Sequence, residues 1–319
     1  MRWRGVGPVL FMILLAAVPP VTALIGEPFY VDLMARVMVF AIAAVSLNFI
    51  LGFGGMVSFG HAAFLGLGAY AVGLLVANGV TNGYIHLAVV IAVAAPVAFI
   101  IGAVCLRTSG LYFIMITLAF AQLLYFIGVG LKQYGGDDGF AFRGHSVFAA
   151  SLPLENDVAL YYLIWTVLTL SLLLLRRIVQ SRFGMALRGV RTNERRMRSL
   201  GLPTYRYRLA AFVISGVLCA IAGALLANLT QFVSPAYMDW TRSGELLIMV
   251  IIGGMSSVFG PVLGATAYLL LEEILSGLTE HWQAILGPIL ILIVLFGRDG
   301  VAWLREKSGG AMQKSAGDG

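Results

Sequence analysis

The sequence has little charge. Only 11% of its 319 residues are charged, whereas 60% are hydrophobic. An ordinary soluble domain carries about 25% charged residues, and this much apolar surface cannot be hidden inside one soluble core. A lipid bilayer is the solvent that fits, and each spanning helix needs about 20 apolar residues. The apolar runs are continuous, whereas spanning β-strands alternate apolar and polar positions. We therefore expect an all-α polytopic membrane protein.

Motifs for catalysis and metal binding are also missing. The sequence has no G-x-x-x-x-G-K-[ST] phosphate loop, so the chain is not expected to hydrolyse ATP by itself. Its two cysteines, Cys105 and Cys219, lie in separate apolar runs and provide neither a disulfide framework nor metal-ligand spacing. We therefore expect no metal, no cofactor and no enzymatic activity in this chain. An active transporter of this kind must use an ion gradient or an ATPase supplied by a partner subunit.

The apolar runs predict about ten transmembrane helices in a single permease domain, residues 1–305, followed by a disordered cytoplasmic tail at 306–319. The first run resembles a signal peptide, but Pro19-Pro20 interrupts it, and we interpret it as the first helix. Glycines and Pro261 crowd the joint between the eighth and ninth runs, so a broken or re-entrant element is an alternative there. The runs cover about 8–25, 31–51, 59–78, 84–106, 112–131, 158–176, 209–230, 244–258, 260–276 and 283–297.

The positions of the basic residues predict the orientation. With ten crossings and a cytoplasmic N-terminus, 17 of the 21 basic residues fall on the inner side, and only Arg36, Lys132, Arg143 and Arg242 fall on the outer side or its edge. Positive charge is retained in short cytoplasmic loops. We therefore expect both termini and residues 176–208 in the cytoplasm, and the loop 132–157 outside. The net charge of +6 then reflects orientation next to membrane lipid, and no nucleic-acid partner is expected.

Two glycine-rich segments interrupt the apolar runs. Residues 52–60, here the first break, contain Gly54-Gly55-Met56-Val57-Ser58, and residues 253–260, the second break, contain Gly253-Gly254-Met255-Ser256-Ser257. Paired interruptions in two halves of a transporter indicate its translocation path and a possible internal repeat. Chance is the alternative, because the chain has 38 glycines. The crossing count also places both breaks on one side, which an inverted repeat would not allow. The candidate path residues are Asn48, Gly54, Gly55, Ser58, His61, Gly253, Gly254 and Ser256.

Simpler roles compete with these. Glycines and alanines in both regions also permit close helix contact. His61 could cap backbone carbonyls that the first break leaves free, or take part in gating. Met56, Met115 and Met249 are expected to pack in the core rather than to form a binding strip.

The segment 176–208 carries ten arginines and one acidic residue, Glu194. An arginine at a helix centre costs roughly 2.5–3.5 kcal/mol on insertion, so this segment must lie outside the bilayer. A short helix over 183–200 is expected, ended by Gly201 with Pro203 beyond it. Such a segment either rests on anionic lipid or docks into a partner protein.

Three stretches resemble the permease family of branched-chain amino acid ABC importers, and within it the LivM type. One runs from Ser46-Leu47-Asn48 through residues 52–64 (GFGGMVSFGHAAF) to Gly68-Ala69-Tyr70. The second includes Phe183-Gly184, Arg188, Thr192-Asn193-Glu194, Gly201 and Ala211-Phe212. The third joins residues 253–257 (GGMSS) to Gly260-Pro261 and Gly264-Ala265.

The resemblance implies a ten-helix permease of the vitamin-B12-importer (type II) fold in the bacterial cytoplasmic (inner) membrane. It implies a second homologous permease subunit of the LivH type, two ABC ATPase subunits that bind ATP and magnesium, and a periplasmic or extracellular substrate-binding protein. Residues 176–208 would hold the coupling helix, although Arg195 and Arg196 stand where the family commonly has small residues. The implied coupling residues are Phe183, Gly184, Arg188, Asn193, Glu194 and Gly201.

The expected function is inward movement of a branched-chain amino acid by alternating access, with urea, short amides and aromatic acids as open alternatives. A gradient-driven secondary carrier or channel without an ATPase is the second hypothesis, and a membrane-embedded enzyme is the third.

Overall fold

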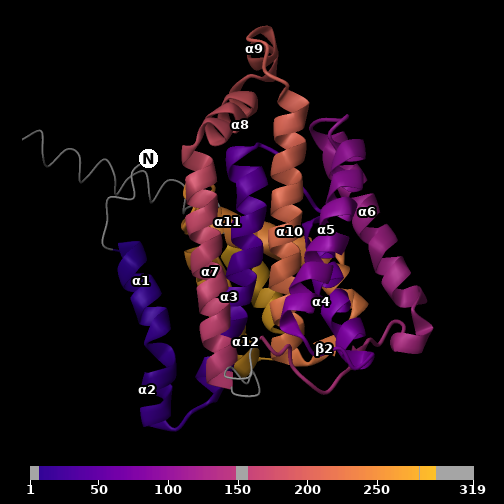
Figure 1. Ribbon diagram of the computed structural model, residues 1–319. Coiled ribbons are helices and arrows are strands. Elements are labelled where there is room, and N and C mark those ends of the chain that lie inside the picture. The colour runs from indigo at the N-terminus through magenta and orange to yellow at the C-terminus, as the bar shows by residue number, and fades with distance from the viewer. Residues whose placement is uncertain (1–6, 149–156, 280, 292–319) are drawn as a thin grey trace, which may run out of the picture. The chain divides into compact units, whose positions relative to one another are not determined.

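The computed structural model describes residues 7–148, 157–279 and 281–291, and their regular elements are helices and one pair of two-residue strands (Figure 1). The helices of the first half are α1 (Gly7–Ala16), α2 (Val18–Ile25), α3 (Phe29–Asn48), η1 (Phe49–Phe53), α4 (His61–Ala77), α5 (Gly83–Cys105), α6 (Leu111–Gly130) and η2 (Lys132–Tyr134). Those of the second half are α7 (Asp157–Gln180), α8 (Arg182–Thr192), α9 (Glu194–Ser199), α10 (Thr204–Thr230), η3 (Pro235–Met238), α11 (Trp240–Gly253), α12 (Gly260–Leu278) and Trp282–Ile291.

The chain divides into two compact units, residues 1–266 and 267–319, and the boundary falls within α12. The first unit holds every site residue that the sequence predicts. The predicted tail at 306–319 lies outside the described residues, and the single-domain assignment of 1–305 stays a prediction.

Six described helices are long and apolar enough to cross a membrane: α3 continued by η1, α5, α6, α7, α10 and α12. Each of the ten predicted runs overlaps a described helix. The polytopic, all-α class is therefore confirmed. Crossing by the shorter apolar helices, and hence the count of ten, stays a prediction.

Helix α3 forms the centre of the first unit. Residues 37–54 are all buried, which is typical of a helix surrounded by other helices. Helix α10 packs against α3, α4 and α5, while α7 and α11 also contact α3. The contact between α4 and α10 is close, because a side-chain atom at Gly68 would meet the Ala220 backbone and one at Gly223 would meet the Leu65 backbone. Small residues thus permit close helix contact, as the sequence predicts.

Two side chains of α7 satisfy backbone carbonyls where the chain is interrupted between α1 and α2. Pro19 and Pro20 have no N–H to donate to the carbonyls of Leu15 and Ala16, four residues earlier. Tyr161 and Tyr162 supply these donors instead, with Oη–O distances of 2.6 Å to Leu15 and 3.2 Å to Ala16. Because a bilayer offers no water for such groups, these two hydrogen bonds stabilise the break in the first predicted crossing.

Helices α5 and α6 lie on the outside of the first unit and expose large apolar side chains. Such a surface in water would be an aggregation hazard, whereas in a bilayer it faces lipid. Met115 on α6 belongs to this face and is 67% exposed, so its predicted place in the core is wrong. Met56 and Met249 are buried as predicted.

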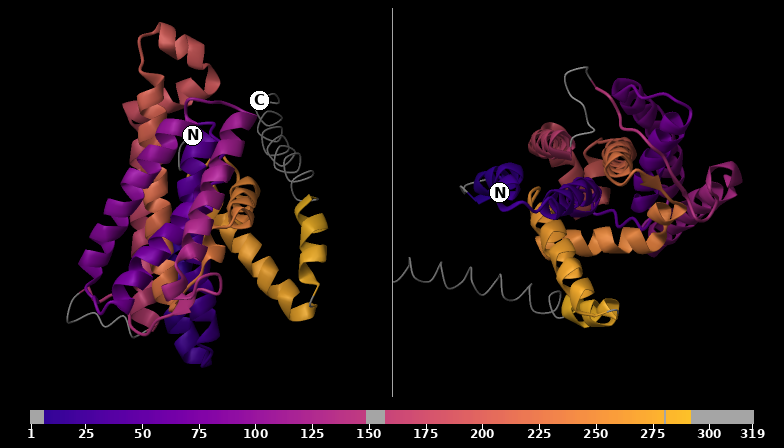
Figure 2. Two further views of the ribbon diagram at one scale, coloured as in Figure 1. Left: turned by 90° about the vertical axis from the view of Figure 1, so that its right-hand side faces the viewer. Right: turned by 90° about the horizontal axis from the view of Figure 1, so that it is seen from below.

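The segments that connect the helices lie at two opposite ends of the first unit (Figure 1). Helices α8 and α9 lie beyond the ends of α7 and α10 that they connect (Figures 1 and 2). At the opposite end, β1 (Phe140–Ala141) pairs antiparallel with β2 (Phe232–Val233). The described part of the loop 132–157 therefore lies opposite the arginine-rich segment, as predicted; which end faces the cytoplasm stays a prediction.

Candidate coupling and translocation site

The first break is a largely buried change of backbone conformation. Helix α3 continues into one π-helical turn, η1, and α4 then begins at His61. Such turns occur frequently at functional sites. Gly55 has φ +70°, a conformation that suits glycine, and Phe59 donates its backbone N–H to Thr117 Oγ1 on α6 at 3.2 Å. Gly54 and Ser58 are buried on either side of Gly55.

His61 joins three helices at the exit of the first break. Its Nε2 lies 3.0 Å from Ser46 Oγ on α3 and 3.3 Å from Ser215 Oγ on α10, and its side chain is fully buried. Ser243 on α11 accepts the Ala62 backbone N–H at 3.0 Å and so satisfies an amide at the start of α4. The His61 side chain thus binds hydroxyl groups rather than capping carbonyls of the break, and its role in gating stays a prediction.

The second break shares the positive-φ glycine and the serine cap of the first break, but it is more exposed. Gly254 occupies the position equivalent to Gly55 and also has a positive φ, +91°. Ser257 Oγ accepts the backbone N–H groups of Phe259 and Gly260, both at 3.2 Å. Residues 255–257 are exposed, so Ser256 faces solvent while its neighbour Ser257 makes the hydrogen bonds.

Asn48 connects the two breaks. Its Nδ2 donates to the carbonyl of Ser257 at 2.8 Å, across the space between α3 and the second break. A side-chain atom at Gly52 would meet the carbonyl of Met255 and Oδ1 of Asn48. Asn48, a predicted path residue, therefore contacts the second break, and the two breaks lie close to each other. That they share one side of the membrane stays a prediction.

The arginine-rich segment forms two helices, and the prediction of one helix over 183–200 is wrong. Asn193 is extended (φ −157°, ψ 97°) between α8 and α9. Its Oδ1 accepts the Arg196 backbone N–H at 3.0 Å. An Asn that caps a new helix competes with continuation of the previous one. Gly201 (φ +80°) closes α9: the N–H of Leu202 bonds the carbonyl of Met197, as in a Schellman ending.

The implied coupling residues hold this segment in shape. Glu194 Oε1 accepts from Arg198 at 2.6 Å and from Thr204 at 3.2 Å, and its Oε2 lies 3.3 Å from Arg208 on α10. Arg188 donates to the carbonyls of Gly184 at 3.2 Å and Val179 at 3.1 Å, which ties α8 to the end of α7.

Two further contacts fix α8 against its neighbours. The Phe183 ring lies 5.3 Å from the Tyr207 ring on α10. A side-chain atom at Gly184 would overlap the Val179 backbone. Met185 and Leu200, by contrast, are 56% and 71% exposed and are available to a partner.

Arg191 is a functional candidate that the sequence motifs do not mark. Its guanidinium donates to the carbonyl of Gly52 in η1, and a Cβ on Gly55 would lie 2.9 Å from its Cγ. The arginine-rich segment therefore contacts the first break directly. The only sequence signal is the position of Arg191 three residues after Arg188, on the same face of α8.

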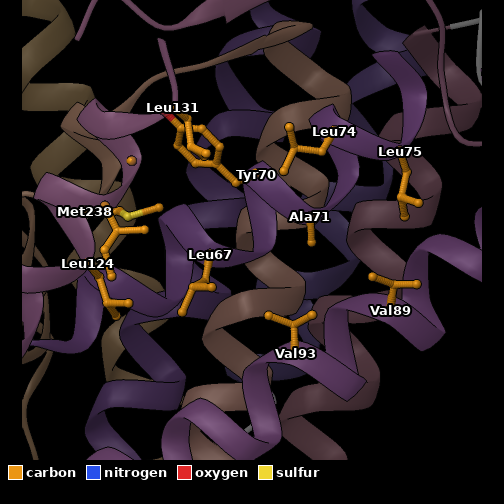
Figure 3. A pocket seen from close by; sticks show the side chains of 12 residues that line it. Leu67, Tyr70, Ala71, Leu74, Leu75, Val89, Val93, Leu124, Leu131 and Met238 are labelled. Carbon is orange, nitrogen blue, oxygen red and sulfur yellow. The ribbon is translucent and has the colours of Figure 1, made fainter. Parts of the chain in front are cut away.

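An apolar pocket of about 310 Å³ lies elsewhere, among α4, α5, α6 and η3 (Figure 3). Leu67, Leu74, Val93 and Met238 are among its lining residues, and no charged side chain lines it. The lining includes the hydroxyl group of Tyr70 but no charged partner, so the ammonium and carboxylate of an amino acid would be costly to bury there. None of the predicted path residues lines this pocket.

Comparisons with known proteins agree with the family motifs. The family described as "Branched-chain amino acid transport system / permease component" matches residues 29–295. The chain is 27% identical over 314 residues to the high-affinity branched-chain amino acid transport system permease protein LivM of Escherichia coli (strain K12), covering 90% of this chain and 74% of that protein.

Two other relatives have a similar extent. The probable branched-chain amino acid transport permease protein LivM of Methanocaldococcus jannaschii is 24% identical, with 84% of this chain and 89% of that protein covered. LivH of E. coli K12 is 25% identical, with 82% and 90% covered. No solved structure matches the chain. The chain belongs to the family of branched-chain amino acid transport system permease components.

Proposed function

We propose that this chain is one permease subunit of an ATP-driven importer that moves a branched-chain amino acid, or a related small solute, inward by alternating access. The observation that carries the proposal is the α8–α9 segment. Internal contacts of Glu194 and Arg188 fix its shape, while Met185 and Leu200 stay exposed among arginines. Arginines that only rest on lipid need no such fixed shape, whereas a docking element does.

The chain would have three kinds of protein partner in this importer. Two ATPase subunits would bind ATP and magnesium, and one of them would dock on α8–α9. A second permease subunit of the LivH type would complete the membrane part, and a periplasmic or extracellular binding protein would deliver the solute. The importer would lie in the bacterial inner membrane with both termini of this chain cytoplasmic, which the distribution of basic residues supports. A vitamin-B12-importer fold with ten crossings is compatible with the described helices.

The alternative is a gradient-driven carrier without an ATPase. Such carriers place ionisable groups near mid-membrane. His61 is the candidate, and its environment of serine hydroxyls gives it neutral hydrogen-bond partners. The described residues contain no group of three or more potential metal ligands. Within the described part of the chain, the contacts of His61 thus leave the alternative without a charged partner for this histidine.

The test is assembly and coupling of the complex. Met185→Asp and Leu200→Asp, each made in the full complex, are expected to weaken ATPase association by more than about tenfold, because an exposed apolar contact becomes a charge in an interface. Val147→Asp adds the same charge to a 44% exposed apolar residue at the opposite end and serves as the control. The measurement is co-purification of the ATPase subunits and substrate-stimulated ATP hydrolysis. Solute transport by the purified chain without any ATPase would refute the proposal.

A further inference from the structure

The end of the α3–η1 helix is held from the arginine-rich segment as well as by its own backbone. The N–H groups of Met56 and Gly55 bond the carbonyls of Ile50, at 3.0 Å, and Leu51, at 3.1 Å. The carbonyl of Gly52 instead accepts from the guanidinium of Arg191 on α8. A helix end leaves carbonyls that need outside donors, and here the donor comes from another element.

The contact between Arg191 and Gly52 depends on the position of α8. Arg188 ties α8 to the last turn of α7, and the Phe183–Tyr207 contact ties it to α10. The aliphatic part of Arg191 also lies against Gly55, the positive-φ glycine of the first break. A shift of α8 therefore reaches the π-helical turn through both a hydrogen bond and a packing contact.

The end of α3, next to the first break, also contacts the second break. Asn48 precedes Gly52 by one turn, and its Nδ2 binds the carbonyl of Ser257. Its Oδ1 is buried and, among the described residues, has no hydrogen-bond partner. Leaving an acceptor unsatisfied is costly, so this atom favours any state that brings it a donor. The first break is largely buried, whereas residues 255–257 are exposed and the space beside Gly254 is open.

We propose that Arg191 and Asn48 are positioning residues that transmit displacement of α8 to both breaks. Arg191 links α8 to the Gly52 carbonyl, and Asn48 links the adjoining turn to Ser257. The second break is the element that moves, because its surroundings leave it room, and the open Oδ1 of Asn48 offers a second place for a donor when it does. This inference rests on the proposed docking of ATPase subunits on α8–α9.

The test uses the assembled complex in nanodiscs, with Cys105 and Cys219 replaced and a reporter cysteine introduced by Ser256→Cys in the second break. The rate of thiol modification at position 256 is measured with and without magnesium and ATP, under conditions that block hydrolysis. We expect the parent complex to show a nucleotide-dependent rate. Arg191→Met, which keeps the aliphatic stem but removes the guanidinium, should abolish that dependence, and so should Asn48→Leu.

Two further variants make the result specific. Arg191→Lys retains an N–H donor and should recover part of the response, which a general loss of structure would not allow. Arg107→Met, an exposed arginine between α5 and α6, is the matched control and should respond like the parent. If Asn48→Leu fails to insert, the Arg191→Met and Arg191→Lys pair decides the question.

The outcomes separate this inference from the proposed function. Failure of the parent chain to bind ATPase subunits would contradict the function itself. A parent complex that hydrolyses ATP without a change at position 256 would overturn the inference and leave the function standing. A nucleotide response that persists in Arg191→Met would overturn it as well.

Discussion

The two glycine breaks share a backbone design but not an environment. Each has a positive-φ glycine, Gly55 or Gly254, followed three residues later by a serine whose Oγ accepts N–H groups near the start of the next helix. The first break is mostly buried, and α6, α8 and α10 contact it or its exit at His61. The second is exposed at residues 255–257 and contacts α3 through Asn48.

This difference shows how one local motif can serve two mechanical roles. Irregular backbone at membrane depth is tolerated only where protein or water satisfies its polar groups. Protein contacts satisfy the polar groups of the first break, so in the proposed mechanism it moves together with its neighbours, whereas the exposed residues 255–257 give the second break room to change shape. The shared design supports the possible internal repeat, which stays a prediction.

Leucine substitutions at the two positive-φ glycines should separate these roles most strongly. Either change costs on the order of 1–3 kcal/mol, because a residue with a Cβ is strained at positive φ. Gly55→Leu must also displace Arg191, 2.9 Å from the added Cβ, whereas no other residue lies within 4 Å of the Cβ position at Gly254. We expect Gly55→Leu to abolish uptake and Gly254→Leu to retain part of it, measured at equal membrane expression.

The control for these variants is Gly130→Leu, at an exposed end of α6 where the added Cβ meets nothing and φ is not positive. It should transport normally. Equal uptake by the Gly55 and Gly254 variants would show that burial of the first break has no mechanical consequence.

Thiol labelling should sharpen the comparison at equivalent positions. Val57→Cys and Ser256→Cys place a reporter at the same point of each motif, in a background without Cys105 and Cys219. We expect much faster modification at 256, because Ser256 is exposed and Val57 is half-buried. An impermeant reagent should reach both from the cytoplasmic side only, in inside-out vesicles. Labelling of either site in intact cells would contradict the predicted orientation.

The sequence was sufficient for features that depend on local composition. The ten apolar runs overlap described helices, which confirms the all-α polytopic class. The family motifs marked Asn48 and Glu194, both of which make long-range contacts. Apolar run length and motif spacing are local properties, so a single sequence carries them.

Contacts between distant elements could not be predicted in this way. Arg191 is one of ten arginines in its segment, and only the three-dimensional position of α8 distinguishes it from the others. Tyr161 gains its role from two prolines in another helix. The division at Asn193 had a local signal, since an asparagine before an acidic residue is typical of a helix start. The helix-ending signal at Gly201 and Pro203 favoured one helix up to that point instead.

The smallest expected difference concerns the two capping serines. Ser58 Oγ accepts the Gly60 N–H at 3.3 Å in a fully buried site, so Ser58→Ala leaves a donor that water cannot reach, at a cost of about 1–3 kcal/mol. Ser257 accepts two N–H groups, but it is exposed, and water can replace its oxygen. Ser257→Ala should therefore cost less, about 0.5–1 kcal/mol, near the lower end for a lost cap. Exposure therefore decides the size of the stability loss more than the number of hydrogen bonds does.

Thermal unfolding of the purified protein in nanodiscs measures the stability of both variants. Ser256→Ala changes an exposed serine beside Ser257 and is the control, expected within about 0.5 kcal/mol of the parent. A larger loss for Ser257→Ala than for Ser58→Ala would mean that protein rather than solvent surrounds the second break, and the contrast between a buried and an exposed break would fail.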